Sequence, residues 1–496
     1  MTALYISLPA LFGEVCEVLR LFVDVRRIEP LDMAVPALEG LSLLLSVSEE
    51  EEIVQCTAEV FADGMRSASY TYSTAAGKGA LEAKRFTKRA AKVCAYRALS
   101  QHFHETLPWG SLTGVRPTRL LRDTEGRLGE AGAKALFLDE FDVQPEKYEL
   151  AKSILTAQAG LYPKSDEIDI YIGIPFCASR CAYCSFASCT PDVFKNAEDL
   201  YTDALLKELS GVEELLQGRR VRALYVGGGT PTALCEANLK RVLSRAAQLA
   251  QGADEFTVEA GRPDTITLEK LRIISEAGAG RVSVNPQTLR DDTLQRIGRA
   301  HTSAQFFEAY EQVKKFGFTV NVDVIAGLPG EGAADTTDTI QRIVALRPDN
   351  ITVHTLAVKR ASRFAQENLA FLPGDDEAAA AVDAGQSILE KAGYQPYYMY
   401  RQKYMKGCQQ NIGFALPGTA CLYNVDVMEE LCDVLAFGAG AISKRIFSQE
   451  NRIERAADTK DLREYIARVD EMIERKRVLF GPGERNPEVL TDESNE

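Results

Sequence analysis

The sequence predicts an α/β protein built around a partial (β/α)6 TIM-type barrel, with a small N-terminal α+β domain and a C-terminal mixed α/β extension. Strand-like apolar segments alternate with helical segments for about 190 residues after Ile168, a pattern typical of βαβ units and a parallel sheet. Short β-rich segments with turn signals precede this stretch, and the alternation fades after Arg360. We therefore expect domains at residues 1–165, 166–375 and 376–496.

The first domain is expected to begin with a strand and a helix, continue with three β-rich segments, and end in a long helix and a connector. These segments are 3–8, 9–22, 41–48, 52–60, 67–74 and a helix that ends near residue 104. The long helix carries a run of basic residues, namely Lys84, Arg85, Lys88, Arg89 and Lys92. A solvated helix face is the preferred interpretation of this run, with nucleic-acid binding as the alternative.

The barrel is expected to contain six strands, each followed by a helix. The strand candidates are 168–175, 221–229, 255–261, 281–288, 319–327 and 350–358. Nearly all of them end in a polar or glycine-bearing turn, and chemistry in α/β folds gathers at the carboxyl ends of the strands. After the barrel, helices are expected at 377–391 and 460–477, with a polar, aromatic stretch between them.

The composition excludes several classes of protein. The 496 residues include 57 Lys and Arg against 71 Asp and Glu, a net charge of -14, so a general nucleic-acid binder is not expected. No window of ~18 uninterrupted apolar residues predicts a membrane span. The chain has 11 cysteines but no sign of a secretory signal, so we expect a cytoplasmic protein with reduced thiols.

Three of these cysteines, Cys177, Cys181 and Cys184, form a C-x3-C-x2-C motif directly after the first barrel strand. Clustered thiolates bind soft metals or iron–sulfur clusters. Structural zinc needs four ligands, and Cys189 could supply the fourth thiolate, so zinc remains an alternative. Three thiolates on a four-iron cluster would instead leave one iron open to bind another molecule.

The segment IPFCASRCAYCSF resembles the signature of the radical S-adenosylmethionine (radical SAM) superfamily. The resemblance implies a barrel of the radical SAM type and a 4Fe-4S cluster on Cys177, Cys181 and Cys184. It also implies one or two molecules of S-adenosylmethionine, one of them bound to the open iron. The cofactor-binding residues that it implies are Tyr171, Tyr183, Ser185, Gly228, Gly229, Thr230, Glu259, Gln287, Arg299 and Asp323.

Within this superfamily, YIGIPFC, VGGGTPT, NVDVIAGLPGE and FGAGAIS resemble the oxygen-independent coproporphyrinogen III oxidase family. The leading domain and GVRPTRL resemble its HemZ branch of coproporphyrinogen dehydrogenases. The resemblance implies oxidative decarboxylation of two propionates of coproporphyrinogen III, giving protoporphyrinogen IX in haem (porphyrin) biosynthesis. A 5′-deoxyadenosyl radical would take a hydrogen from the propionate β-carbon, so no catalytic side chain is assigned. An electron donor and an unidentified acceptor are implied partners.

A substrate with four propionates needs cationic partners, and arginine suits carboxylates. The aromatic stretch 397–406 offers Arg401 and Lys403 as candidate substrate ligands; the alternative is a surface helix end with solvated cations.

Two other functions stay open. The best-known branch has Gly-Cys after its third cluster cysteine, where this chain has Ser185-Phe186, and a related branch of haem-trafficking chaperones has a similar sequence there. A third possibility is a different radical enzyme on the same scaffold, such as a methyltransferase. The N-terminal domain and the elaborated region 397–424 favour the dehydrogenase.

Overall fold

The computed structural model of the chain describes residues 2–23, 27–50, 52–77, 79–184, 189, 197–358, 362–365, 372, 374–403, 405–450 and 452–481. The chain divides into two compact units, Met1–Lys152 and Ser153–Glu496, each of which is described by itself. The division falls inside helix α4 (Pro145–Gln158), before the boundary expected at residue 165.

Unit 1 contains a five-stranded sheet in the order β2-β1-β3-β4-β5. Its strands are β1 (Thr2–Ile6), β2 (Glu29–Pro30), β3 (Leu41–Glu50), β4 (Ile53–Ala62) and β5 (Met65–Ala75). Strand β1 lies parallel to β2 and β3, whereas β3, β4 and β5 form an antiparallel meander. Alternate residues of β4, such as Val54, Cys56 and Ala58, are fully buried, because successive side chains of a strand point to opposite faces.

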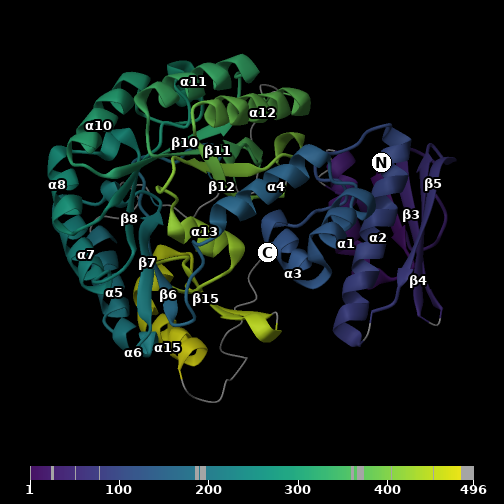
Figure 1. The fold of residues 1–496 in the computed structure, drawn as a ribbon, viewed down its shortest axis with the longest axis horizontal. Helices are drawn as coiled ribbons and strands as arrows, with labels where there is room; N and C mark the ends of the chain where they lie inside the picture. The colour runs from purple at the N-terminus through teal and green to yellow at the C-terminus, as the bar shows by residue number, and fades with distance from the viewer. Residues whose placement is uncertain are drawn as a thin grey trace. The chain divides into compact units, whose positions relative to one another are not determined.

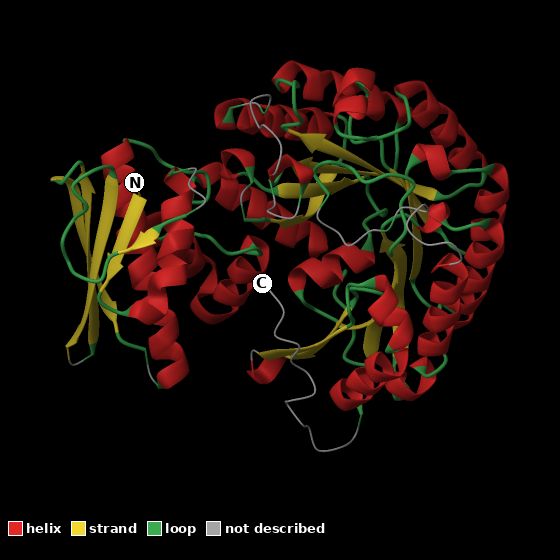
Figure 2. Ribbon diagram, turned by 180° about the vertical axis from the view of Figure 1, so that it is seen from behind, coloured by secondary structure: helices red, strands yellow, loops and turns green. Residues whose placement is uncertain are grey.

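The helices of unit 1 lie on one face of this sheet (Figure 2). They are α1 (Phe12–Phe22), α2 (Ala80–Phe103), α3 (Pro117–Ala135) and the start of α4. Helix α2 packs against β4 and β5, and α1 packs against α2. The order of strands and helices follows the one that the sequence predicts for the first domain.

Unit 2 is built on an eleven-stranded sheet with six consecutive parallel strands at its centre. These strands are β6 (Glu167–Ile174), β7 (Arg220–Gly228), β8 (Glu255–Gly261), β9 (Arg281–Val284), β10 (Thr319–Ala326) and β11 (Asn350–Thr355). They are neighbours in chain order, as expected for a partial (β/α)6 barrel. The predicted fold class is therefore confirmed.

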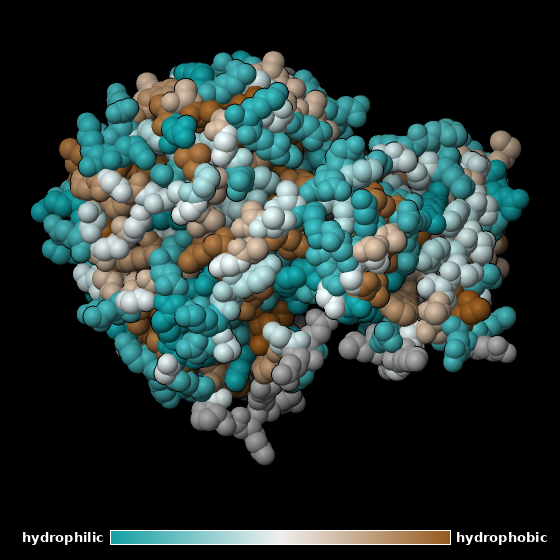
Figure 3. Space-filling view, viewed as in Figure 1, coloured by the Kyte–Doolittle hydropathy of each residue, from teal (hydrophilic) through white to brown (hydrophobic). Residues whose placement is uncertain are grey.

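The helices that connect these strands follow the outside of the curved sheet (Figure 1). They are α5 (Ala197–Leu209), α6 (Val212–Leu216), α7 (Glu236–Leu249), α8 (Leu268–Glu276), α9 (Asp291–Arg296), α10 (Ser303–Lys315) and α11 (Ala333–Leu346). Helix α7 buries Leu239, Val242, Leu243 and Ala246, which share one face at helical spacing. The outward faces of these helices carry mostly hydrophilic side chains, with hydrophobic ones scattered among them (Figure 3).

The C-terminal region extends the sheet at both edges. Strand β13 (Asn411–Ala415) adds antiparallel to β11, and β12 (Gln395–Tyr400) adds antiparallel to β13. At the other edge β14 (Asp433–Phe437) adds parallel to β6 and is followed by β15 (Ile442–Phe447) and β16 (Arg452–Ala457). The helices are α12 (Asp375–Lys391), α13 (Leu422–Glu429), α14 (Leu462–Ala467) and α15 (Val469–Phe480). The aromatic stretch is thus a strand pair, and the alternative of a surface helix end was wrong.

In the described part of the chain, no helix combines the length and the apolar character that crossing a membrane requires.

Candidate active site at the carboxyl ends of the parallel strands

A cavity of about 360 Å³ opens at the carboxyl ends of the parallel strands of unit 2. Eleven of the predicted site residues line it, drawn from the loop after β6 and from the ends of the strands that follow. They are Cys177, Cys181, Tyr183, Cys184, Gly228, Gly229, Thr230, Glu259, Gln287, Arg299 and Asp323. The fold thus brings residues up to 146 positions apart in the sequence into one cavity.

Three other predicted residues lie elsewhere, and a fourth is not described. Tyr171, on β6, is not among the residues that line the cavity; its ring lies beside the stacked rings of Tyr225 and Tyr423. Ser185 lies outside the described residues. Arg401 is buried and Lys403 is exposed, and the cavity wall includes neither.

Arg401 directly follows strand β12, which ends at Tyr400. Alternate residues of a strand share a face, and Tyr398 and Tyr400 both line the cavity, whereas Arg401 does not. One guanidinium nitrogen of Arg401 donates to the carbonyl oxygen of Cys408 at 3.4 Å. Burial lowers the pKa of Arg401 to about 10.

The cysteine loop is fixed to the barrel by backbone hydrogen bonds at its base. The N–H of Cys189 donates to the carbonyl of Pro175 at 2.7 Å, and the N–H of Cys177 donates to the carbonyl of Cys189 at 3.1 Å. In the middle of the loop, the N–H of Ala182 donates to the carbonyl of Ile297 at 2.9 Å. These bonds set the direction in which the chain leaves β6 and therefore where the three thiols lie.

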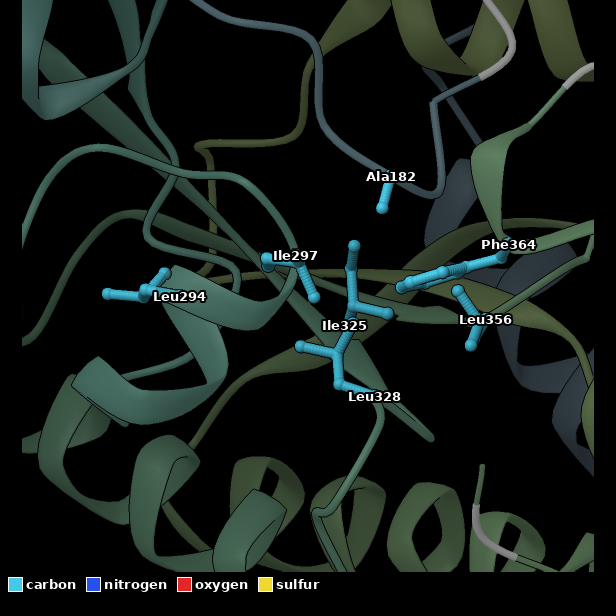
Figure 4. Close-up of a cluster of buried hydrophobic side chains, with 7 residues drawn as sticks. All are labelled: Ala182, Leu294, Ile297, Ile325, Leu328, Leu356 and Phe364. Atoms are coloured by element: carbon cyan, nitrogen blue, oxygen red, sulfur yellow. The ribbon is translucent and has the colours of Figure 1, made fainter. Parts of the chain in front are cut away.

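Ala182 also anchors the loop through apolar packing. Its methyl group points into a cluster of buried side chains that includes Ile297, Ile325, Leu356 and Phe364 (Figure 4). Ala182 is buried, whereas its neighbours Cys181 and Tyr183 line the cavity. The alanine therefore holds the loop against the barrel, and the polar side of the loop faces the cavity.

The glycine turn after β7 passes directly beneath this loop. Gly228 has a φ of 108°, a conformation that L side chains rarely adopt. The N–H of Gly229 donates to the carbonyl of Ile174 at 2.7 Å. A Cβ at position 229 would lie 2.6 Å from the carbonyl oxygen of Phe176 and 3.0 Å from the Cys177 sulfur. Only glycine therefore allows the turn to approach the first cysteine so closely.

Two arginines place positive charge beside the cysteine loop. Arg299 is fully buried; it donates to the Tyr183 hydroxyl at 3.1 Å and to the carbonyl of Asn285 at 3.0 Å. Arg262 lies with one guanidinium nitrogen 3.9 Å from the Cys181 sulfur, and it pairs with Asp264. Cations next to thiols favour the thiolate form that metal binding needs.

Glu259 and Asp323 form a carboxyl pair whose pKa values are shifted in opposite directions. Burial, together with repulsion from Asp323, raises the pKa of Glu259 to about 8. Burial would also raise the pKa of Asp323, but hydrogen bonds from His354, Asn321 and Thr352 hold it below its ordinary value. At neutral pH the pair therefore presents one protonated carboxyl group, a donor, and one carboxylate, an acceptor.

Two residues of the cavity wall have buried polar side-chain atoms that form no hydrogen bond within the described residues. Gln287 has a φ of 69°, and its side-chain oxygen has no hydrogen-bond partner among the described residues. The same holds for the Nε atom of Arg299. Buried polar groups are normally satisfied, so these atoms indicate places for the polar groups of a bound molecule.

The arrangement of the thiols bears on which metal group fits. Among the described residues, no three Cys, His, Asp or Glu side chains converge closely enough to hold one metal ion. A 4Fe-4S cluster places each thiolate on a separate iron, so its ligands need not share one coordination sphere. The three partly buried thiols beside two arginines therefore fit a cluster better than they fit a single zinc ion.

Sequence reasoning missed several residues of the cavity, among them Arg262, Asn321 and His354. Arg262 directly follows the end of β8, and Asn321 and His354 occupy β10 and β11, so strand-end position and period-2 alternation were available as signals. Tyr398 and Tyr400, two tyrosines of the aromatic stretch 397–406, also line the cavity.

Comparison with known proteins agrees with this fold. The family model of the radical SAM superfamily matches residues 171–343. A curated relative from Bacillus subtilis (strain 168), oxygen-independent coproporphyrinogen-III oxidase-like protein HemZ, is 33% identical over 87% of this chain and 88% of its own length. Heme chaperone HemW from Haemophilus influenzae is 29% identical over 64% of this chain and 80% of its own.

Among solved structures, the coproporphyrinogen III oxidase HemN from Escherichia coli matches with a TM-score of 0.51 and 24% identity, covering 67% of this chain and 74% of that one. At this identity the match shows the fold. Fold and cavity together define a radical SAM protein. With the HemZ relative aligned over most of both chains, this chain belongs to the oxygen-independent coproporphyrinogen III oxidase-like family of the radical SAM superfamily.

Proposed function

We propose that this chain catalyses the oxygen-independent oxidative decarboxylation of coproporphyrinogen III to protoporphyrinogen IX. The observation that carries the proposal is the cavity in which three cysteines of one loop meet a glycine turn, a carboxyl pair and two arginines. The alignment with the HemZ relative over most of the chain supports the choice of substrate.

The family implies a 4Fe-4S cluster and S-adenosylmethionine as cofactors. In this proposal Cys177, Cys181 and Cys184 hold the cluster. When bound, the two cofactors supply a 5′-deoxyadenosyl radical that takes a hydrogen atom from the substrate. The chain's own residues bind and orient the reactants: Arg262 and Arg299 balance the negative charge of the thiolates, and the glycine turn leaves room for close approach to the backbone.

The remaining polar groups suit the parts of S-adenosylmethionine. A protonated Glu259 beside an ionised Asp323 offers a donor and acceptors to vicinal hydroxyl groups such as those of a ribose. The unpartnered oxygen of Gln287 can accept from an ammonium group, and Arg299 can donate to a carboxylate.

The substrate side of the cavity is formed by aromatic and amide side chains from the C-terminal strands. Tyr398, Tyr400 and Gln402 of the β12 segment and Asn411 of β13 line it. Aromatic rings with polar ends provide both stacking surface and hydrogen bonds, which suits a flat macrocycle with polar substituents.

The reaction also requires partners. Conversion of one propionate to a vinyl group releases one carbon dioxide, one proton and two electrons. One electron leaves with the hydrogen atom taken by the radical, and the other must pass to an acceptor. A one-electron donor is needed to start each cycle.

A haem-trafficking chaperone is the second candidate. HemW relatives align with more than half of the chain, and the cavity wall includes His354, an imidazole that could serve as an axial haem ligand.

An anaerobic assay with the reconstituted full-length protein separates the two candidates. With S-adenosylmethionine, a strong reductant, an electron acceptor and coproporphyrinogen III, we expect 5′-deoxyadenosine and protoporphyrinogen in parallel. Formation of 5′-deoxyadenosine without a decarboxylated product would show that the substrate is wrong. Stoichiometric haem uptake without turnover would favour the chaperone.

Replacing Cys177, Cys181 or Cys184 by alanine should abolish both the visible iron–sulfur absorption and the formation of 5′-deoxyadenosine. Cys235→Ala, at an exposed cysteine that does not line the cavity, is the matched control and should keep both. A variant of the loop that retained a full 4Fe-4S cluster would contradict the ligand assignment.

A further inference from the structure

Unit 1 contains a cationic pocket that the proposed reaction does not use. Its volume is about 220 Å³, and it lies between α2, α3 and the connector before α3. Its charged wall is formed by Arg85, Lys88, Arg89, Lys92, Arg127 and Glu14. Val93, Leu112, Leu120 and Phe141 supply an apolar part of the wall. Of the basic run of α2, which was expected to be a solvated face, Lys84 and Arg85 are exposed, whereas Lys88, Arg89 and Lys92 are half-buried.

The positive charge of this pocket is only partly neutralised. Glu14 pairs with Lys88 and Lys92, Glu17 lies 3.6 Å from Lys92, and Glu140 lies 3.4 Å from Arg89. Burial would raise the pKa of Glu14, but the two lysines lower it to about 2, so it is ionised. Five cations thus face three ion-paired carboxylates, which leaves an excess of two positive charges.

The excess resides on Arg85 and Arg127. Within the described chain, neither guanidinium forms an ion pair with a carboxylate. Burial and then repulsion from Arg127 and Arg89 lower the pKa of Arg85, whereas Glu82 acts in the opposite direction. The folded unit therefore holds like charges together at a cost that a bound anion would relieve.

This concentration of positive charge is local. Residues 84–127 contain ten Lys and Arg against three Asp and Glu, in a chain whose net charge is -14. A general attraction for polyanions does not account for such a contrast, because the long-range field of the whole chain is negative.

We propose that this pocket binds a small organic anion whose dianionic head, a phosphate or a pair of carboxylates, lies between Arg85 and Arg127. Guanidinium groups match the oxygens of both heads in bidentate geometry. The apolar side chains at Leu112 and Leu120 would contact the body of the ligand. An open pocket of about 220 Å³ that is part apolar, with Arg85 and Arg127 exposed at its wall, suits a small molecule better than it suits the extended backbone of a nucleic acid.

The single tryptophan of the chain gives a direct measurement. Trp109 is buried, and its carbonyl accepts a hydrogen bond at 3.0 Å from the N–H of Leu112, a residue of the pocket wall. Fluorescence of the full-length protein can therefore be titrated at low ionic strength with phenyl phosphate, phthalate and inorganic phosphate. The first two probes distinguish a phosphate head from paired carboxylates on an aromatic body.

We expect saturable binding of phenyl phosphate or phthalate, tighter than that of inorganic phosphate and weakened by salt. Arg85→Gln combined with Arg127→Gln should weaken binding by about tenfold or more, because charge-assisted contacts are lost. Lys84→Gln is the matched control, since Lys84 is an exposed cation of the same helix that lies outside the pocket wall, and it should bind like the wild type.

Three results would overturn the proposal: no saturable binding of either aromatic probe, binding by the double variant equal to that of the wild type, or binding of an oligonucleotide that depends on the same arginines while the small probes fail. Because the variants remove repulsion, their melting temperature should not fall, which separates lost binding from lost structure. The readout needs neither the cluster nor turnover, so it does not depend on the proposed reaction.

Discussion

At the scale of single residues, Glu259 has the environment with the most direct consequence for solution behaviour. Its carboxyl group is buried beside Asp323, and its pKa rises from 4.5 to about 8. Between these two values the native protein holds a proton that the unfolded chain has released. The free energy of unfolding must therefore fall as pH rises through this window, by at most roughly 1.4 kcal/mol per pH unit.

Glu259→Gln removes the titration and keeps a neutral, hydrogen-bonding side chain. Between pH 5 and 8 the free energy of unfolding of the wild type should decline because of this proton, and that of the variant should lack this contribution. The stability of the variant relative to the wild type should therefore increase with pH. Urea denaturation at several pH values measures the difference. Glu259→Asp keeps a carboxyl group and should retain the decline. Parallel curves for Glu259→Gln and the wild type would show that this carboxyl group does not hold the proton.

Residues were predictable from the sequence where a strand end alone determined their place. Glu259 lies near the end of a recognisable apolar strand, so its position at the edge of the sheet followed from the pattern. Arg401 was chosen for its charge, yet Tyr400 at the end of β12 lines the cavity, and Arg401, directly after the strand, does not. The face of a short strand depends on the strand with which it pairs, and that information is not local.

At the scale of elements, the turn after β7 is the most tightly constrained part of the site. Gly229→Ala would bring a Cβ within 2.6 Å of the backbone oxygen of Phe176, which cannot move without displacing the cysteine loop. We expect less cluster per chain after reconstitution, measured by iron content and visible absorption. Gly280→Ala is the control, since a Cβ there meets nothing within 4 Å. Equal cluster content in both variants would contradict the proposed constraint.

The same scale shows why the six parallel strands could be predicted and the C-terminal strands could not. Strands β6 and β10 alternate apolar residues with polar ones and are almost entirely buried, and the parallel strands alternate with helices of regular period. Strands β12 and β13 are short and rich in tyrosine and amide residues. They become strands because β13 pairs with β11 and β12 pairs with β13, contacts that no local pattern encodes.

At the scale of the whole molecule, a buried ion cluster in unit 2 connects helix α15, near the end of the described chain, with helix α5 of the barrel. Lys476 of α15 is fully buried and pairs with Glu208 of α5, at 2.6 Å, and with Asp458 after β16. The hydroxyl of Tyr465 donates to Glu208 at 2.6 Å.

Lys476→Met would leave two carboxyl groups buried without their cation. Loss of one partner from a buried ion pair costs roughly 3–5 kcal/mol, so we expect a large drop in the free energy of unfolding. Chemical denaturation of the full-length protein measures it. Lys240→Met, at an exposed position of α7, should change stability little. A similarly small effect at Lys476 would mean that the cluster does not hold the C-terminal elements in place.

The parallel pairing of β14 with β6 also determines how long one edge of β6 stays unpaired during synthesis. Strand β6 ends at Ile174, but the strand that covers its outer edge begins only at Asp433. At translation rates of ~5–20 residues per second, that edge leaves the ribosome roughly 10–50 s before its partner exists. An open strand edge is a template for pairing with other chains. The nascent protein therefore passes through an interval in which escape from aggregation depends on protection of β6 by other means.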